Sequence, residues 1–171
     1  MWRNLRYVFI VLLFGCSSSK VIYDYDLKSD FSQYKTFLFF ADAGKGLNEL
    51  DLKRFKRSIE TELDSLRINS DKNPDFYINI IVEKTELEPN SIILGIGGAG
   101  RNVGGAINTS TSIGGAKFNE KVVLEFVDGK KNTIFWQAII NSTVRERMKT
   151  LDRVAYVEKI IDKILQGYPP K

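Results

Sequence analysis

The chain has 171 residues, of which 43% are hydrophobic and 27% are charged, with a formal net charge of +4. This length and composition suit one globular domain with a hydrophobic core. The single cysteine excludes an internal disulfide framework, and the lack of histidine excludes Ser-His triads and the usual histidine-ligated zinc sites. Basic and acidic residues are interspersed, as in residues 53–64, so no nucleic-acid partner is expected.

The amino terminus has the organisation of a secretory signal. Arg3 and Arg6 supply a positive region, residues 7–14 form an unbroken apolar run, and Gly15 is a small residue at the expected cut. The apolar run is far shorter than the roughly 20 residues that span a bilayer. We therefore predict that residues 1–15 are a signal peptide and not a membrane span.

Residues 13–16, LFGC, resemble the lipobox of bacterial lipoproteins, in which the cysteine is acylated and becomes the first residue of the mature protein. The resemblance implies that Cys16 contacts the membrane through acyl chains such as palmitate, with residues 16–20 as a lipidated tether. Ser17 stands where aspartate favours inner-membrane retention in some bacteria. We therefore expect an outer-membrane lipoprotein that faces the periplasm or the cell surface.

Two strands are expected at the start of the domain. Residues 21–26 alternate between apolar and polar side chains, which places Asp24 and Asp26 on one face of a strand. This pair is either a solvated strand face or a carboxylate pair able to bind a metal or transfer protons. Residues 36–40 are β-prone and apolar on both sides, which predicts a central strand.

A helix is expected after Asn48, which is a suitable capping residue, because Glu49 and Asp51 give its first turn negative charge. Its apolar residues recur at steps of three and four, which indicates one stripe that faces a sheet. The stripe consists of Leu52, Phe55, Ile59, Leu63 and Leu66.

A half-buried strand is expected over residues 76–82, after a polar break at residues 69–74. Its continuation carries Glu83, Glu86 and Glu88. These glutamates are either a charged edge that discourages pairing with another sheet or the carboxylates of a catalytic site.

A β-hairpin is expected where residues 122–127 and 133–140 flank a turn at Asp128 and Gly129. Trp136 lies within an apolar run of the second strand, which favours a place in the core over a role as a carbohydrate-stacking platform.

The chain is expected to end in a helix that Thr150 caps and that Gly167 and the following prolines stop. Its apolar stripe consists of Leu151, Val154, Val157, Ile161 and Ile164. The elements then follow the order β-β-α-β-β-β-α. This order predicts an α+β fold over residues 21–171, with two helices packed on one face of a largely antiparallel sheet.

Residues 95–115 are rich in glycine and are expected to be an insertion between two strands. Gly95, Gly97 and Gly100 match the dinucleotide-binding fingerprint, but no helix begins after Gly100, so neither a nucleotide nor another cofactor is expected. Loops of this length are often functional. The candidate partner-contact residues in this insertion are Gly97, Gly98, Arg101 and Asn102.

Several short blocks together resemble the family known as domain of unknown function 4136. They are Asp24-Tyr25-Asp26, Asp30-Phe31, Tyr34, Thr36-Phe37, Pro74-Asp75-Phe76, Leu124, Val127-Asp128, Trp136 and Pro169-Pro170. The resemblance covers nearly all of the mature chain and implies a small envelope lipoprotein. The family has no established reaction, so it implies no catalytic residue. The chain departs from the family pattern after the first helix, where a glycine is common and Arg67-Ile68-Asn69 stands here.

Two functions therefore fit the sequence. The first is a non-catalytic module that binds an envelope protein or a glycan at the outer membrane. The alternative is a carboxylate-dependent envelope hydrolase that uses Asp24 and Asp26, or Glu83, Glu86 and Glu88, as acid and base. A buried pocket that holds two of these carboxylates would favour the enzyme, whereas solvated strand edges would favour the module.

Overall fold

A computed structural model describes residues 19–87 and 117–170 of the chain. The strands are β1 (Val21–Tyr25), β2 (Thr36–Phe39), β3 (Asn69–Ser70), β4 (Phe76–Leu87), β5 (Lys117–Asp128) and β6 (Ile134–Arg145), and the helices are α2 (Glu49–Ser65) and α3 (Thr150–Leu165). A 3-10 turn, Phe31–Gln33, precedes β2. All six strands form one sheet in the order β1-β6-β5-β4-β2-β3.

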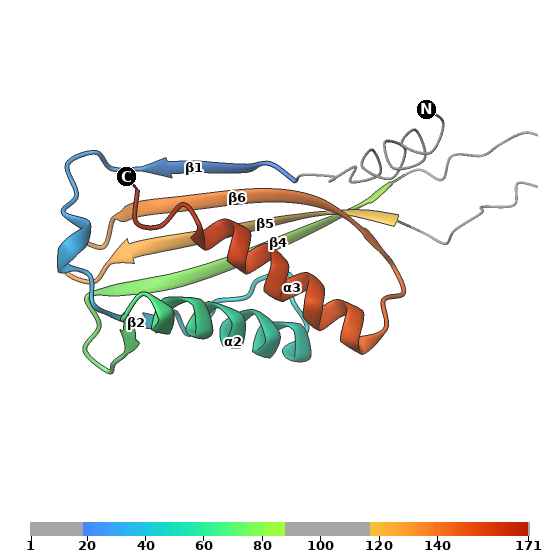
Figure 1. Cartoon of the computed structure of the whole chain (residues 1–171), viewed down its shortest axis with the longest axis horizontal. Helices are drawn as coiled ribbons and strands as arrows, with labels where there is room; N and C mark the ends of the chain where they lie inside the picture. Colours follow the sequence, from blue (N-terminus) through green and yellow to red (C-terminus); the bar gives the residue numbers. More distant parts are fainter. Residues whose placement is uncertain (1–18, 88–116, 171) are drawn as a thin grey trace, which may run out of the picture.

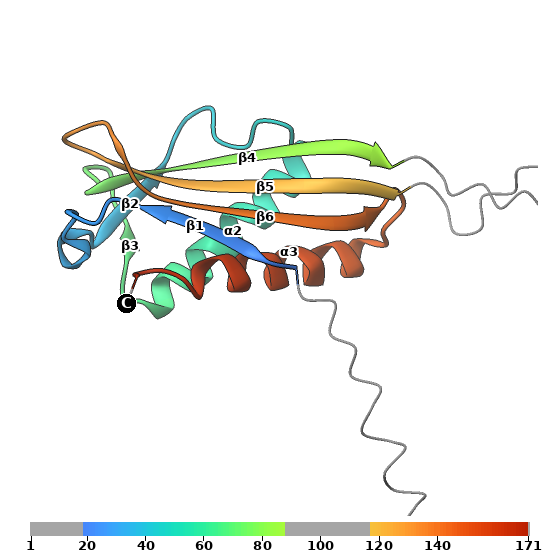
Figure 2. The ribbon, with the colours of Figure 1, turned by 90° about the horizontal axis from the view of Figure 1, so that it is seen from above.

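The helices α2 and α3 cover the same face of this sheet (Figures 1 and 2). Both begin at the end of the sheet where β4 ends and β5 starts, so they run side by side in the same direction. The strands β1, β6, β5 and β4 pair antiparallel, whereas β2 is parallel to both β4 and β3. The predicted α+β class, with two helices on one face of a largely antiparallel sheet, is confirmed.

The predicted central position of residues 36–40 is wrong. In the described part of the chain, β2 lies next to the edge of the sheet, and the two-residue β3 lies beyond it. Its apolar residues differ in burial, since Phe37 is fully buried while Leu38 and Phe39 are half-buried. The residues of β3 are both exposed, so no apolar pattern marks this strand within the predicted polar break.

The core fills the space between the helices and the sheet. Along β4 the inward-facing residues alternate with half-buried ones as predicted, and Trp136 of β6 is fully buried, so it is a core residue. The fully buried residues that the helices contribute are Phe55, Ile59, Leu63, Val157, Ile161 and Ile164. Two terminal members of the predicted stripes, Leu66 and Leu151, are instead 40% and 81% exposed.

The ends of the helices show how local chemistry fixes their positions. The side chain of Asn48 accepts a hydrogen bond from the backbone amide of Asp51 at 2.9 Å, which confirms the predicted cap of α2. The cap predicted for α3 is wrong, because Lys149 occupies that position without a side-chain bond and Thr150 is already helical. After α2 the backbone of Arg67 has φ 61, which is the left-handed conformation that favours glycine.

The segment between β2 and α2 follows the edge of β4 and sets the start of the helix. The amide of Gly44 donates to the carbonyl of Ile80 at 2.8 Å, and the amide of Val82 donates to the carbonyl of Lys45 at 2.9 Å. Gly46 has φ 87, and a Cβ at this position would meet the carbonyl oxygen of Val82. Glycine is therefore required where the chain passes β4 before entering α2.

Candidate functional site: a buried arginine between two carboxylates

Most of the residues predicted to carry function lie outside the part of the chain that the structure describes. These are the cleavage site at Gly15, the lipidation site at Cys16, Glu88, and the candidate contact residues Gly97, Gly98, Arg101 and Asn102.

The two aspartates near β1 do not form a site. Asp24 is exposed on β1, where it lies opposite Gln137 of β6. Asp26 follows the strand and closes a turn by accepting hydrogen bonds from the Lys28 amide at 2.9 Å and the Ser29 hydroxyl at 3.2 Å. The amide of Lys28 in particular lowers the pKa of Asp26 below its ordinary value. Both aspartates therefore have the solvated surroundings expected of a strand face and a turn.

The glutamates at the end of β4 have similar surroundings. Glu83 and Glu86 are exposed, and Glu83 forms an ion pair with Lys121 of β5 at 3.2 Å. Cross-strand pairs of this kind contribute little free energy because water screens both charges. The exposed end of β4 is the solvated strand edge that the module hypothesis expects.

The structure instead gathers three buried charged residues: Asp51 of α2, Glu120 of β5 and Arg153 of α3. They are 5%, 0% and 8% exposed. The guanidinium group of Arg153 donates to both oxygens of Asp51 at 3.0–3.2 Å and to both oxygens of Glu120 at 3.0 and 3.1 Å. This bidentate arrangement joins the two helices to the sheet.

The fold explains why these residues meet. Asp51 and Arg153 each lie in the first turn of a helix, and both helices start at the same end of the sheet. Arg153 comes one turn before Val157, so it belongs to the buried side of α3. Glu120 points inward from β5 because it shares the face of Val122 and Leu124, both of which are fully buried.

Outer cations complete the charge balance. Arg54 pairs with Asp51 at 2.7 Å, and Lys84 pairs with Glu120 at 3.4 Å. Burial raises the pKa of Asp51, but the hydrogen bonds from Arg153 and Arg54 lower it by more, so the pKa lies below its ordinary value. Burial lowers the pKa of Arg153, and Glu120 and Asp51 raise it above its ordinary value. Asp51 and Arg153 therefore both stay charged across the physiological range.

These charges limit the chemistry of the site. General acid–base catalysis by two carboxylates requires one that is protonated near neutral pH. Arg153 donates hydrogen bonds to all four carboxylate oxygens of Asp51 and Glu120, and the pKa of Asp51 lies below its ordinary value. The arrangement is suited to holding α2 and α3 against β5 rather than to transferring protons.

A hollow of about 450 Å³ opens beside this cluster. Its lining comes from the starts of both helices and from the adjoining ends of β4, β5 and β6, and includes Asn48, Arg54, Lys84, Phe118, Arg145 and Met148. Within residues 19–87 and 117–170, no group of three potential metal ligands occurs. The same part of the chain contains no helix with the length and apolar character needed to cross a membrane.

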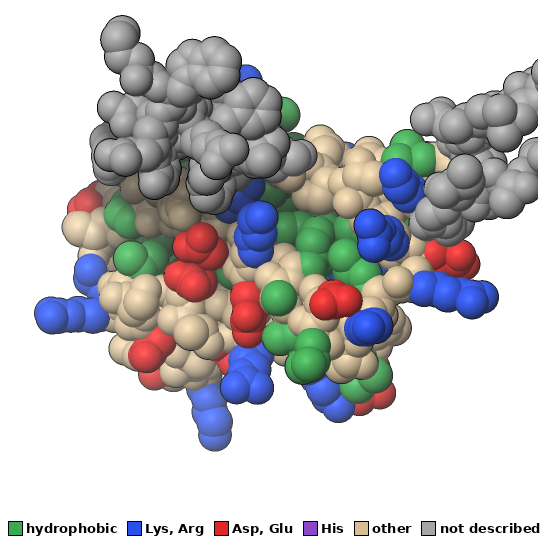
Figure 3. Space-filling model, turned by 45° about the vertical axis from the view of Figure 1, so that its right-hand side comes forward, with side chains coloured by type: hydrophobic (Ala, Val, Ile, Leu, Met, Phe, Trp, Pro, Cys, Tyr) green, Lys and Arg blue, Asp and Glu red, His purple; other side chains and the backbone are tan. Residues whose placement is uncertain are grey.

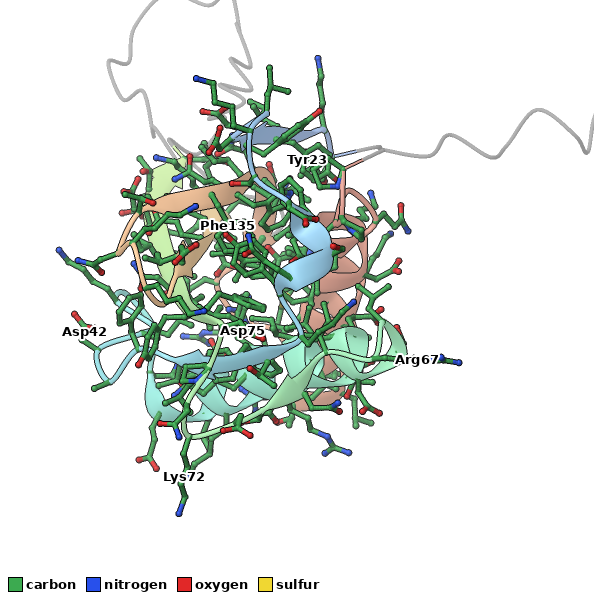
Figure 4. The ribbon with its side chains drawn as sticks, turned by 90° about the vertical axis from the view of Figure 1, so that its left-hand side faces the viewer. Tyr23, Asp42, Arg67, Lys72, Asp75 and Phe135 are labelled. Carbon is green, nitrogen blue, oxygen red and sulfur yellow. The ribbon has the colours of Figure 1, made fainter. Side chains whose placement is uncertain are left out.

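The residues that carried the family resemblance cluster at the opposite end of the sheet. The hydroxyl of Tyr34 donates to Asp128 at 2.8 Å, and its ring stacks on Phe135 with centroids 3.8 Å apart. Burial, followed by the hydrogen bond to Asp128, raises the pKa of Tyr34 to about 12. Figure 4 shows this end of the molecule with Phe135, which is buried, and Asp75, which is half-buried, near the middle of the view. These motifs therefore have structural roles in joining the loops.

Sequence reasoning did not predict the buried cluster. It interpreted Asp51 only as a favourable charge in the first turn of a helix and did not consider Arg153. One signal was available, because Arg153 lies four residues before Val157 on the apolar side of α3. A lone arginine on a buried stripe indicates that a carboxylate partner lies nearby.

Similar folds occur in solved structures. A PDZ domain protein from Parabacteroides distasonis ATCC 8503 matches with TM-score 0.58 and 17% identity, over 90% of this chain and 36% of that chain. The present chain thus spans about a third of that protein's length. A PelC dodecamer from Paraburkholderia phytofirmans matches with TM-score 0.51 and 12% identity, over 86% of this chain and 96% of that chain. At these identities the similarity shows a shared fold alone.

No curated protein matches the sequence. Residues 21–170 match the family described as "Domain of unknown function (DUF4136)". The match includes every strand and helix of the described structure and the blocks on which the resemblance rested. The chain therefore belongs to the DUF4136 family.

Proposed function

We propose that this chain is a lipid-anchored outer-membrane lipoprotein of the bacterial envelope and acts as a non-catalytic binding or assembly module. The observation that carries the proposal is the lipobox-like run of residues 13–16, which lies directly before a domain that begins with β1 at Val21. An acylated Cys16 gives such a domain a membrane anchor without a membrane-spanning helix.

The positions of the carboxylates support a non-catalytic role. Asp24 and Asp26 are solvated, Glu83 is paired with Lys121 on the surface, and the buried acids Asp51 and Glu120 are both bound by Arg153. The surface also mixes charges of both signs over the face that Figure 3 shows. This mixture supports a protein or glycan partner rather than nucleic acid.

The face of the sheet opposite the helices supports a role in assembly. The register of the strands aligns four apolar residues in a row across this face, namely Ile22, Ile139, Val123 and Ile81. Ile22 is 55% exposed, and the stacked rings of Phe40 and Tyr77 lie on the same side. One protein of similar fold, PelC, is described as a dodecamer. A second copy of this chain is therefore a partner that the fold supports. The proposed contact residues of the insertion are still Gly97, Gly98, Arg101 and Asn102.

Labelling with a radioactive fatty acid tests the anchor. Cells that express the wild-type chain should incorporate label, whereas the Cys16→Ser variant should give an uncleaved or soluble precursor without label. Ser17→Ala serves as the matched control and should be labelled like the wild type. Equal labelling of Cys16→Ser and wild type would contradict the proposal.

Site-specific cross-linking in intact cells tests the partner. A photo-reactive amino acid at Ile139 lies on the face of the sheet opposite the helices, here called the open face. The same group at Glu60, which is exposed on α2, provides the control. Products that appear only from position 139 would support binding through the open face, and their masses distinguish a second copy from another envelope protein. Equal products from both positions would contradict a specific interface there.

A further inference from the structure

We propose that the hollow beside the start of β1 binds the phosphate group of a membrane phospholipid and thereby orients the domain on the membrane. The inference rests on the proposed acylation of Cys16 and goes beyond it, because a flexible tether alone sets no orientation.

The tether brings this region close to the membrane. Residues 16–20 join the acylated cysteine to Val21, the first residue of β1. An extended chain spans at most about 3.6 Å per residue, so Val21 lies within roughly 18 Å of the lipid surface. The start of β1 therefore stays close to the headgroups, whatever the orientation of the domain.

A hollow of about 310 Å³ lies at this point, between the start of β1, the end of β6 and α3. Figure 2 shows the start of β1 beside the middle of α3. The hydroxyls of Ser19 and Ser142 lie 3.5 Å apart, and the Tyr23 hydroxyl donates to the carbonyl of Lys163 at 2.8 Å. These contacts hold β1 against β6 and α3, so the hollow exists before any ligand binds.

The lining has the chemistry of an anion site. Its charged residues are Lys159 and Lys163, and no carboxylate is among the residues that line it. The two lysines are four residues apart, so they project from one side of α3. In the described ranges neither lysine forms an ion pair.

Neutral donors lie in the same hollow. Ser142, on the face of β6 that points toward α3, and Ser19 line it and supply hydroxyl groups. Ammonium and hydroxyl donors together match the oxygens of a phosphate. The tether favours a lipid phosphate as the occupant, because the tether keeps the hollow close to the headgroups. Basic residues at that position gain free energy from anionic lipid.

The test uses the full chain, acylated in cells and reconstituted in phosphatidylcholine vesicles with or without phosphatidylglycerol. The mass of the purified protein establishes acylation first, so failure of the anchor is seen separately from failure of docking. A fluorophore at Ala155→Cys, one turn before Lys159, reports the distance to headgroup-spin-labelled lipid, and Asn73→Cys reports the far end. The acylated Cys16 leaves no other thiol to label.

We expect stronger quenching at position 155 than at position 73, with an increase when phosphatidylglycerol is present. Lys159→Gln with Lys163→Gln should lower the ratio of docked to free domain about thirtyfold, as the loss of two surface cations predicts. Arg57→Gln with Lys72→Gln removes the same charge elsewhere and should have little effect. Figure 4 shows Lys72 pointing away from the domain.

Three results would overturn the proposal. These are equal quenching at both labels, unchanged quenching in the Lys159 and Lys163 variant, and release of the domain by millimolar inorganic phosphate, which would assign the hollow to free phosphate. Thermal unfolding of each variant shows that the domain is folded in all of the comparisons.

Discussion

Thr36 and Asp75 bind each other through both backbone and side chains, although 39 residues separate them in sequence. The carboxylate of Asp75 accepts from the amide and the hydroxyl of Thr36, each at 2.9 Å, and the amide of Asp75 donates back to the carbonyl of Thr36 at 2.9 Å. The pair fixes the start of β2 against the start of β4, where both strands enter the sheet.

Asp75→Asn should lower the free energy of unfolding by about 1–3 kcal/mol at neutral pH, because the amide replaces a charged acceptor of several hydrogen bonds. Urea denaturation measures the change. Asp42→Asn, an exposed position that Figure 4 places at the surface, is the control and should change stability little. Equal stability of the two variants would show that the Asp75 carboxylate has no special role.

The same pair predicts a pH dependence. Burial raises the pKa of Asp75, but the amides of Lys35 and Thr36 and the Thr36 hydroxyl lower it below its ordinary value of 3.8. A carboxyl with a lowered folded pKa adds stability that is present above 3.8 and is lost as pH falls through the folded value. The stability difference between wild type and Asp75→Asn should therefore shrink in acid.

Arg153→Met should destabilise the domain by about 3–5 kcal/mol, because it leaves Asp51 and Glu120 buried without their shared cation. Additional replacement of both acids, as Asp51→Leu and Glu120→Leu, should restore much of this loss, since well-packed apolar groups often replace buried ion pairs without cost. Chemical denaturation of the single and triple variants tests the idea. If the triple variant were as unstable as the single one, lost packing rather than unpaired charge would be the cause.

Arg67→Gly should raise the free energy of unfolding by up to about 1 kcal/mol, because Arg67 has φ 61 and glycine adopts this conformation without a Cβ penalty. The matched control is Arg57→Gly in the middle of α2, which should destabilise by about 1 kcal/mol. A loss of stability in Arg67→Gly would mean that the arginine side chain contributes more than its backbone strain costs.

Replacement of residues 95–115 by a short Gly-Ser linker should leave the melting temperature nearly unchanged. Leu87 and Lys117 are paired at the adjoining ends of β4 and β5, so a short linker would be long enough to connect these strands. The free energy of loop closure changes only slowly with loop length. A large fall in melting temperature would contradict the prediction that this segment is an insertion.

Local periodicity explains which elements could be predicted from sequence. The strands β4, β5 and β6 and both helices carry apolar repeats that match their burial, as in Phe76, Ile78 and Ile80. The place of β2 beside the edge was not predictable in this way, because it depends on parallel pairing with β4 and on a two-residue exposed strand. Strand order is set by contacts distant in sequence, which a local repeat does not encode.

The buried cluster was missed for the same reason. Arg153 meets Asp51 across 102 residues and Glu120 across 33 residues. Each of these residues has an ordinary local explanation, because Asp51 and Arg153 are charged residues in the first turn of a helix and Glu120 is a strand residue. The three side chains meet because both helices begin at the same end of the sheet, which no local sequence pattern encodes.

The position of β1 has a consequence for biosynthesis. Among the residues that the structure describes, β1 pairs with β6 alone, as in the match of Val21 with Ile140. A chain that emerges with its amino terminus first offers β1 no partner until nearly all of the domain has followed. The edge of the sheet is therefore completed late, and β1 stays unpaired through most of synthesis, during which a holding chaperone has a segment to bind.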